Sequence, residues 1–374
     1  MANDSENSTV IDLFRNLFAI DARSLAIVRV LIASILFVQA FHSFHMLGME
    51  PSEMADLSAS LNSEGAWSLF WLIESESFVW ICIAINLVSS ICLFLGVGTF
   101  LATAACLVIS WSLQVYNPAF VATGNDLLCI VLFWGLFLPW GNCWSVSNLK
   151  YKDPRPAKWT VVSSGTIGIM LQLASLYFFW GMASMLNGYQ VEELVQTVEM
   201  NARSYTGWIV ESPVMLEAIY PWLLVVFIVG TLLMFVPYLQ QYCRGVMMAL
   251  LLLGHLLAGL TMRSGIFPVV AIATWFVFVP GSVWNLLLGT PPNFDRDQRQ
   301  EFVLLRRGWQ SVCLVFVVFV LILNIRSVTR TGNEKLSDFD ALMSSVANTT
   351  MTQQNFKMFS KMPSKPSDPP LSNE

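Results

Sequence analysis

Charge is what this 374-residue sequence has least of. Only 12% of its residues are charged, whereas 55% are hydrophobic, and a soluble domain usually carries about twice that share of charge. This composition excludes an ordinary soluble globular protein. The net charge of −5 also argues against nucleic acid as a partner, because surfaces that bind nucleic acid are basic.

Cysteine patterning and the common motifs of enzymes are missing as well. The seven cysteines show no CxxC spacing and nearly all fall in or beside apolar stretches. We therefore expect small buried side chains, with no disulfide framework and no metal site. The sequence has no phosphate-binding loop, no GxGxxG after a strand and no GxSxG elbow. We expect no cleavable signal peptide, because residues 1–19 are polar and amphipathic.

What the sequence has instead is long apolar stretches. Several reach roughly the 20 residues that cross a bilayer as a helix, and lipid offers no partners to the polar backbone of any other open structure. We predict an all-α fold, a polytopic integral membrane bundle of about nine transmembrane helices. Gly96 and Gly98 predict a tight turn between the second and third helices. The expected helices are 25–45, 78–95, 99–116, 126–140, 160–186, 215–238, 245–262, 265–283 and 309–325.

Basic residues alternate between loops and predict the orientation. Lys and Arg accumulate in cytoplasmic loops. Here they occur before the first predicted helix and in every second loop after it, whereas the remaining loops are mainly acidic. We therefore expect a cytoplasmic N-terminal segment at 1–24, a transmembrane domain at 25–325 and a polar, flexible outer tail at 326–374. The lipid bilayer is then the first partner. The lack of cysteine in the outer loops favours a bacterial inner membrane.

Three stretches of the sequence resemble a known family. They are IDARSLAIVR at 20–29, then GNDLL at 124–128 with LFWGLFLPWG at 132–141 and WSV at 144–146, then GHLL at 254–257 with GIFP at 265–268 and FVP at 278–280. In this order and spacing they are similar to the horizontally transferred transmembrane (HTTM) domain, the membrane core of the vitamin K-dependent gamma-carboxylase-like family. The resemblance implies the same helical fold over residues 12–290. By family alone, it also implies a quinone of the vitamin K type as the candidate ligand.

One position departs from the family pattern. The best-known member uses a lysine on its fifth membrane helix, three residues after a glycine, as the base that deprotonates vitamin K hydroquinone. The corresponding stretch is YFFWGMAS at 177–184, so Ser184 occupies the lysine position. A serine hydroxyl cannot act as that base without a neighbouring one, and no lysine occurs between Lys158 and Lys335. Gamma-carboxylation is therefore not expected, and catalysis of any kind stays open.

Four polar residues, three on the fifth and seventh predicted helices and one just after the seventh, are candidates for lining one intramembrane cavity. His255 is the only histidine expected deep in the core, and Arg263 follows it at i+8 on about the same face. Tyr177 and Ser184 are seven residues apart and share a stripe of the fifth helix. Ionisable groups inside a membrane usually face a partner or a water-filled space.

Two further charged residues belong to the same candidate pocket. Arg29 lies about one turn inside the first helix, where it could anchor an anionic or quinone ligand. It equally fits an arginine that snorkels or pairs helices at the membrane edge. Asp126 opens the fourth helix, where a carboxylate favours the positive end of the helix dipole or makes a polar contact in the pocket. His255 likewise fits a hydrogen-bonded structural residue.

Two functions fit these observations. The first is a redox or lipid-modifying membrane enzyme that holds a quinone-like or other lipophilic small molecule between its helices. The second is a non-enzymatic scaffold that binds a lipid or a partner and has lost the chemistry of the family. A wet polar cavity would favour the first function, and a centre filled by Phe, Met and Leu would favour the second. A transporter is disfavoured, because neither broken helices nor repeated halves are evident in the sequence.

Overall fold

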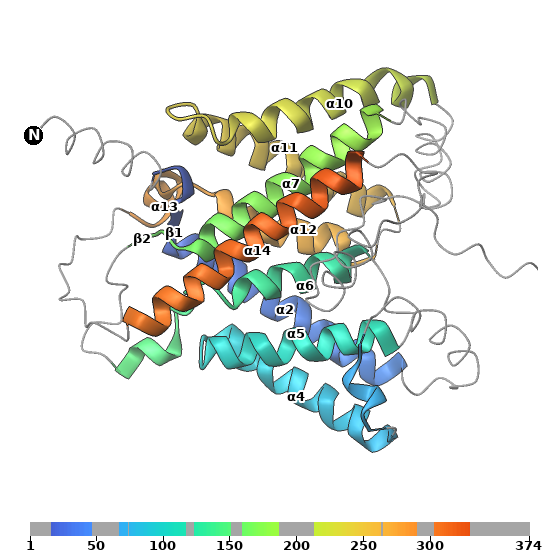
Figure 1. The fold of residues 1–374 in the computed structure, drawn as a ribbon, viewed down its shortest axis with the longest axis vertical. Coiled ribbons are helices and arrows are strands. Elements are labelled where there is room, and N and C mark those ends of the chain that lie inside the picture. Colours follow the sequence, from blue (N-terminus) through green and yellow to red (C-terminus); the bar gives the residue numbers. More distant parts are fainter. Residues whose placement is uncertain are drawn as a thin grey trace, which may run out of the picture.

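The computed structural model describes residues 16–46, 67–73, 75–116, 123–150, 159–186, 213–262, 265–289 and 303–329. These residues are mostly helical (Figure 1). The longer helices are α2 (Ala22–Met46), α4 (Glu76–Leu95), α5 (Thr99–Tyr116), α6 (Thr123–Gly135), α7 (Ser164–Leu186), α10 (Pro213–Leu233), α11 (Gln240–Thr261) and α14 (Val303–Thr329). The shorter helices are α12 (Phe267–Trp275), α13 (Gly281–Leu288) and the 3-10 turns η3 (Leu69–Trp71), η5 (Val146–Lys150) and η7 (Phe276–Phe278).

Five of these helices are long and apolar enough to cross a membrane. They are α2, α4, α5, α7 and α11, and α12 with η7 and α13 makes a sixth candidate if that bent pair is one span. Shorter apolar stretches lie in α6, α10 and α14. The predicted helical fold is confirmed, and its five candidate spans fit the predicted membrane protein.

Helix α2 packs against both α4 and α12, and α6 packs against α5, α7 and α12. Helix α7 packs against both α10 and α14, and α11 packs against α12. In Figure 1 the α4–α5 pair forms one edge of the bundle and the α10–α11 pair the opposite edge, with α7 and α14 crossing between them. The largest apolar core lies at the centre and includes the fully buried Trp134, Trp140 and Trp275.

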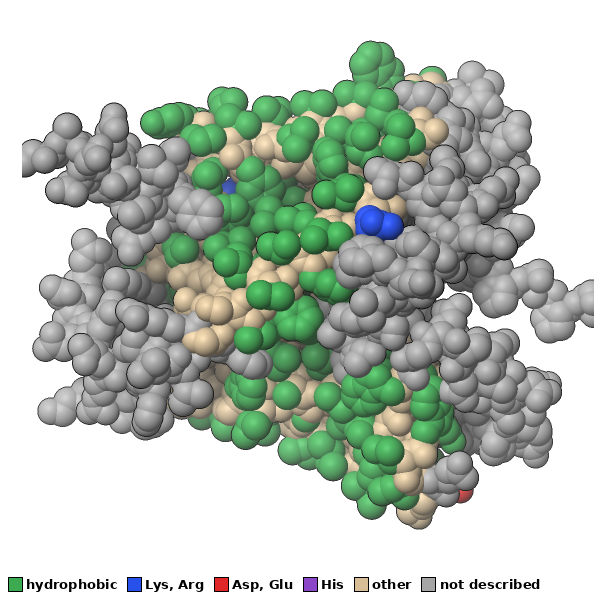
Figure 2. Space-filling view, in the orientation of Figure 1, with side chains coloured by type: hydrophobic (Ala, Val, Ile, Leu, Met, Phe, Trp, Pro, Cys, Tyr) green, Lys and Arg blue, Asp and Glu red, His purple; other side chains and the backbone are tan. Residues whose placement is uncertain are grey.

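Burial is reversed relative to a soluble protein. Asn86, Thr103, Thr166 and Arg29 are buried between helices, whereas the outward surface is apolar. In Figure 2 most of the described side chains on the visible face are apolar, and charged ones are few. Exposed leucines, isoleucines and valines suit contact with acyl chains, because in lipid only the backbone and the polar side chains need shielding.

The turn between α4 and α5 has the backbone geometry that its two glycines predict. Gly96 ends α4 with φ of 74°, and its amide donates to the carbonyl oxygens of Cys92 and Leu93. The next amide, of Val97, donates to Cys92 over 2.8 Å. A left-handed residue of this kind closes a helix at low cost only when it is glycine. The predicted tight turn at Gly96 and Gly98 is confirmed.

The chain departs from the prediction at the eighth expected helix. A single span was predicted over 265–283. This prediction is wrong beyond Phe278, because the helix breaks after that residue. The segments Phe267–Phe278 and Gly281–Leu288 are bent by 93°. Pro280 explains the break, since it lacks an amide donor and forces Val279 out of the helical region. Val279 has φ −64° and ψ 117°.

A two-residue antiparallel ladder ties the start of α2 to the start of α7. Strand β1 (Ile20–Asp21) pairs with β2 (Thr160–Val161), with Ile20 opposite Val161 and Asp21 opposite Thr160. The Ala22 amide extends the contact by donating to the Trp159 carbonyl oxygen over 2.7 Å. The ladder places the N-terminal ends of two candidate spans, α2 and α7, side by side at one end of the bundle.

Candidate functional site

Tyr177, His255 and Trp275 meet in one buried hydrogen-bonded chain. They come from α7, α11 and α12. The Tyr177 hydroxyl oxygen lies 3.0 Å from His255 Nε2 and 3.1 Å from Trp275 Nε1. The exposed fractions of the three residues are 3%, 7% and 0%. Three helices therefore place a phenol, an imidazole and an indole in contact inside the bundle.

The partners of His255 fix the direction of this chain. His255 Nδ1 lies 2.6 Å from the Leu251 carbonyl oxygen, which only accepts, so Nδ1 carries the proton. In the neutral imidazole Nε2 is then an acceptor. The Tyr177 hydroxyl donates to it, and the Tyr177 oxygen accepts from the Trp275 indole. Both nitrogens of His255 are thus occupied, and the Tyr177 oxygen keeps one further lone pair.

Aromatic rings surround the three polar residues. The contacts are Phe227 on Tyr177, Phe267 on His255 and Phe278 on Trp275, with ring centroids 5.7, 5.5 and 4.8 Å apart. The rings of Tyr177 and His255 are 5.8 Å apart and nearly perpendicular, at 89°. These distances are those of packed aromatic pairs. The phenol–imidazole pair therefore has an apolar surrounding that strengthens its hydrogen bond.

Ser184 lies on the same helix as Tyr177 but further along it. It is half-buried. Between the two, Gly181 faces α10, because a Cβ atom at that position would lie 2.9 Å from the Ile228 side chain. The structure thus brings Tyr177 and His255 together and leaves Ser184 about two turns away along α7. Arg263 lies outside the described residues.

Arg29 is completely buried and joins the start of α2 to the loop after α6. Its Nη1 donates to the carbonyl oxygens of Trp140 and Cys143 over 2.9 and 3.2 Å, and its Nη2 donates to that of Trp144 over 2.5 Å. Its Nε has no partner among the described residues. Arg29 therefore neither snorkels nor pairs with a carboxylate in the described part of the chain. It instead satisfies backbone carbonyl oxygens of the loop between α6 and η5, which have no regular secondary structure to pair with.

Asp126 lies in the first turn of α6, as its position at the start of the helix predicted. The Gln114 side-chain amide on α5 donates to Asp126 Oδ1. The neighbouring Asn125 accepts a 2.7 Å hydrogen bond from Gln39 on α2. These amides connect α6 to α2 and α5. They are separate from the hydrogen-bonded chain of Tyr177, so the five candidate residues that the structure describes do not form one cluster.

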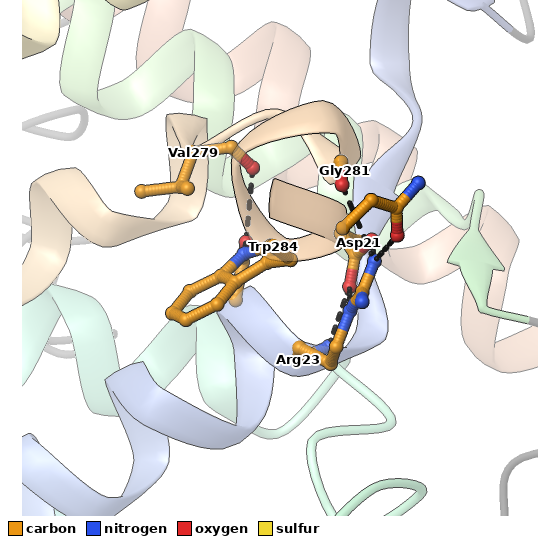
Figure 3. Close-up of polar contacts among 7 residues, drawn as sticks. Asp21, Arg23, Val279, Gly281 and Trp284 are labelled. Atoms are coloured by element: carbon orange, nitrogen blue, oxygen red, sulfur yellow. Dashed lines mark hydrogen bonds and ion pairs between the residues drawn. The ribbon is translucent and has the colours of Figure 1, made fainter. Parts of the chain in front are cut away.

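A polar cluster that the sequence analysis missed joins the start of α2 to α13 (Figure 3). Asp21 caps α2, since its Oδ1 accepts from the Arg23 amide over 2.8 Å. The Arg23 guanidinium binds both Asp21 oxygens, at 2.9 and 2.7 Å, and donates to Asn285 Oδ1 over 2.9 Å. Ser24 accepts from Trp284 Nε1 over 2.7 Å and donates to the Val279 carbonyl over 3.0 Å.

A second buried arginine was also missed. From the predicted helices 215–238 and 245–262, Arg244 is expected in the basic loop between them, but it lies inside α11 and is only 8% exposed. Its Nε donates to the Met234 carbonyl over 3.2 Å, and its Nη2 donates to the Leu17 carbonyl. Its guanidinium carbon lies 5.9 Å from the centre of the Phe235 ring. The sequence carries no signal for such carbonyl partners, because every residue has a carbonyl group.

No cluster of three or more His, Cys, Asp or Glu side chains able to hold a metal ion occurs in the described ranges. Tyr177 and His255 are able to hydrogen-bond a ligand or to transfer a proton. Comparison with protein-family models, with curated proteins and with solved structures gave no match in any of the three.

Proposed function

We propose that this chain is an integral membrane protein similar to the carboxylase-like HTTM domain and that it takes a lipophilic ligand, a quinone or a lipid, beside Tyr177 and His255. The observation that carries the proposal is the 3.0 Å hydrogen bond between these two buried residues. Ionisable groups buried among apolar helices are costly and commonly functional. A lipophilic ligand would enter from the bilayer, the proposed partner, in a bacterial inner membrane.

His255 takes the role of proton acceptor in this proposal. Ser184 stands where the family has its basic lysine, and a hydroxyl alone is no base. A neutral imidazole whose Nδ1–H is bound to a carbonyl oxygen can receive a proton at Nε2. Tyr177 holds that nitrogen and has a free lone pair on its own oxygen. A hydroxyl group of a reduced quinone would donate to that lone pair, and its proton would pass through Tyr177 to His255.

The first test is to purify the protein and identify what comes with it. Native mass spectrometry and extraction of bound lipids should reveal a quinone. The His255→Ala variant should lose the quinone, whereas the His42→Ala control, at an exposed histidine on α2, should keep it. Retention of the quinone by both variants would remove His255 from the proposal. Circular dichroism of each variant shows whether it is folded.

A non-enzymatic scaffold is the second candidate function. One observation favours it, namely that both nitrogens of His255 are already satisfied inside the protein and that phenylalanine rings pack around the pair. Copurification of bulk phospholipid alone, together with a His255→Ala variant that is merely less stable, would support this alternative over the first.

A further inference from the structure

We infer that α13 lies in the plane of the membrane interface and that its outward leucines contact the lipid below the headgroups. The inference concerns a surface of the protein and does not depend on the proposed ligand. Its first basis is orientation. The segment Phe267–Phe278 and the following α13 meet at 93°. If the first segment runs across the bilayer, then α13 runs along the surface of the bilayer.

The second basis is the reversed burial of α13. Its inward face holds Trp284, which is 8% exposed, and Asn285, which bonds to Arg23. Its outward side holds Leu286 and Leu287, which are 85% and 66% exposed. A surface helix in water shows the opposite pattern, with its leucines facing the protein. An apolar outward face beside a polar inward one suits a helix whose surroundings are acyl chains.

The third basis is that hydrogen bonds and close packing fix α13 against the start of α2. Trp284 donates to Ser24, and Ser24 donates to Val279 (Figure 3). Gly281 lies so close to the start of α2 that a Cβ atom there would be 2.8 Å from Asp21 Oδ2. These contacts hold α13 across the end of a candidate membrane span. Its leucines therefore stay outward and cannot turn into the protein.

The fourth basis is the tryptophans around α13. Trp144 is 47% exposed and meets Trp284 edge to face, with ring centroids 6.3 Å apart. Trp159 lies under the Arg23 guanidinium, whose central carbon is 5.3 Å from its ring. Tryptophans gather where a protein crosses from acyl chains to headgroups. The occupant of the outward face is therefore the bilayer itself, in continuity with the apolar surface of the bundle.

The test is the depth of spin labels in lipid vesicles. Leu286→Cys and Leu287→Cys are made in the full chain, labelled with a nitroxide and reconstituted into vesicles of phosphatidylcholine and phosphatidylglycerol. The unsubstituted chain gives the background from native cysteines. Leu253→Cys, at a 55% exposed position within the α11 span, is the reference for a deep label. We expect collisions with oxygen to exceed collisions with a water-soluble nickel complex at 286 and 287, but by less than at 253.

Two results would overturn the inference. More frequent collisions with nickel than with oxygen would place α13 in water. Few collisions with either reagent would mean that protein covers it, either another part of this chain or a second copy. A second measurement does not need the nitroxide: an impermeant maleimide on both sides of the vesicles should react slowly with the two cysteines and rapidly after denaturation. Rapid reaction in intact vesicles would again place α13 in water.

Discussion

Tyr177 and His255 are 78 residues apart in the sequence, yet the phenol of one donates to the imidazole of the other over 3.0 Å. The contact holds α7 against α11, and both helices also pack against α10. The pair therefore has a structural role that mutation can measure separately from any chemistry.

Removal of the Tyr177 hydroxyl should destabilise the protein. Tyr177→Phe leaves His255 Nε2 and Trp275 Nε1 buried without a partner, which costs about 1–3 kcal/mol. The measurement is thermal unfolding in detergent, followed by circular dichroism. Tyr238→Phe is the matched control, because Tyr238 is 85% exposed. Equal melting temperatures for the two variants would show that the buried hydroxyl contributes nothing to stability.

Arg29→Lys should be poorly tolerated although the charge is kept. The guanidinium reaches three carbonyl oxygens, of Trp140, Cys143 and Trp144, and a lysine ammonium lacks that forked geometry. Each lost hydrogen bond to a charged group removes about 1.5–3 kcal/mol. Arg326→Lys, at an exposed position on α14, is the control. We expect Arg29→Lys alone to lower the yield of folded protein and its unfolding temperature; equal behaviour would show that a point charge suffices.

Gly96 and Gly98 form a matched pair for a third prediction. Both have positive φ, 74° and 54°, so alanine costs about 1–2 kcal/mol of backbone strain at either one. At Gly96 a Cβ atom would also lie 2.6 Å from Ser145 Oγ and 2.7 Å from Arg29 Nη1, whereas space is open at Gly98. Gly96→Ala should therefore unfold at lower temperature than Gly98→Ala. The reverse order would mean that the Arg29 and Ser145 side chains can move away freely.

The Cys143 thiol should resist alkylation in the folded protein. It lies between α6 and η5, is 1% exposed, and burial followed by the negative charge of Asp21 raises its pKa to about 11. Because the thiolate is the reactive form, iodoacetamide at pH 8.5 should label Cys143 rapidly only after denaturation. Mass spectrometry of the digested peptides measures this, and equal labelling of folded and denatured protein would contradict it.

Ionisation of the Cys143 thiol should lower the stability of the folded protein at alkaline pH. Its folded pKa is above the unfolded value, so the stabilisation by the neutral thiol is complete below the unfolded pKa. It is then lost as the pH rises through the folded value of about 11. Cys143→Ser should therefore flatten the fall in stability between pH 9 and 11. An unchanged slope would show that other groups dominate in this range.

The sequence predicted helices better than it predicted their partners. The long apolar runs and the glycine turn at Gly96 carry local signals, so α2, α4, α5, α7 and α11 were expected within a few residues. Pro280 is a local signal too, but the long apolar run that it interrupts led to a single predicted span. The break there became evident only from the 93° bend.

The candidate site was only partly foreseen. Tyr177 and His255 stood out as polar residues within apolar helices. Trp275 did not, because a tryptophan in an apolar helix gives no sign that its indole nitrogen has a partner. The acceptors of Arg29 were hidden for a different reason: they are backbone carbonyls, which no residue type marks. The nine spans, the cytoplasmic N-terminus and the ligand stay predictions.

The carbonyl partners of Arg29 also set an order of events during synthesis. The acceptors are made 111 to 115 residues after the arginine, which at about 5–20 residues per second is a delay on the order of ten seconds. The acceptor of the Ser24 hydroxyl is synthesised later still, because the Val279 carbonyl lies 255 residues further along the chain. Helix α2 therefore leaves the ribosome with a charge that the protein has not yet satisfied. Until the loop after α6 emerges, water, headgroups or the insertion machinery must solvate that arginine.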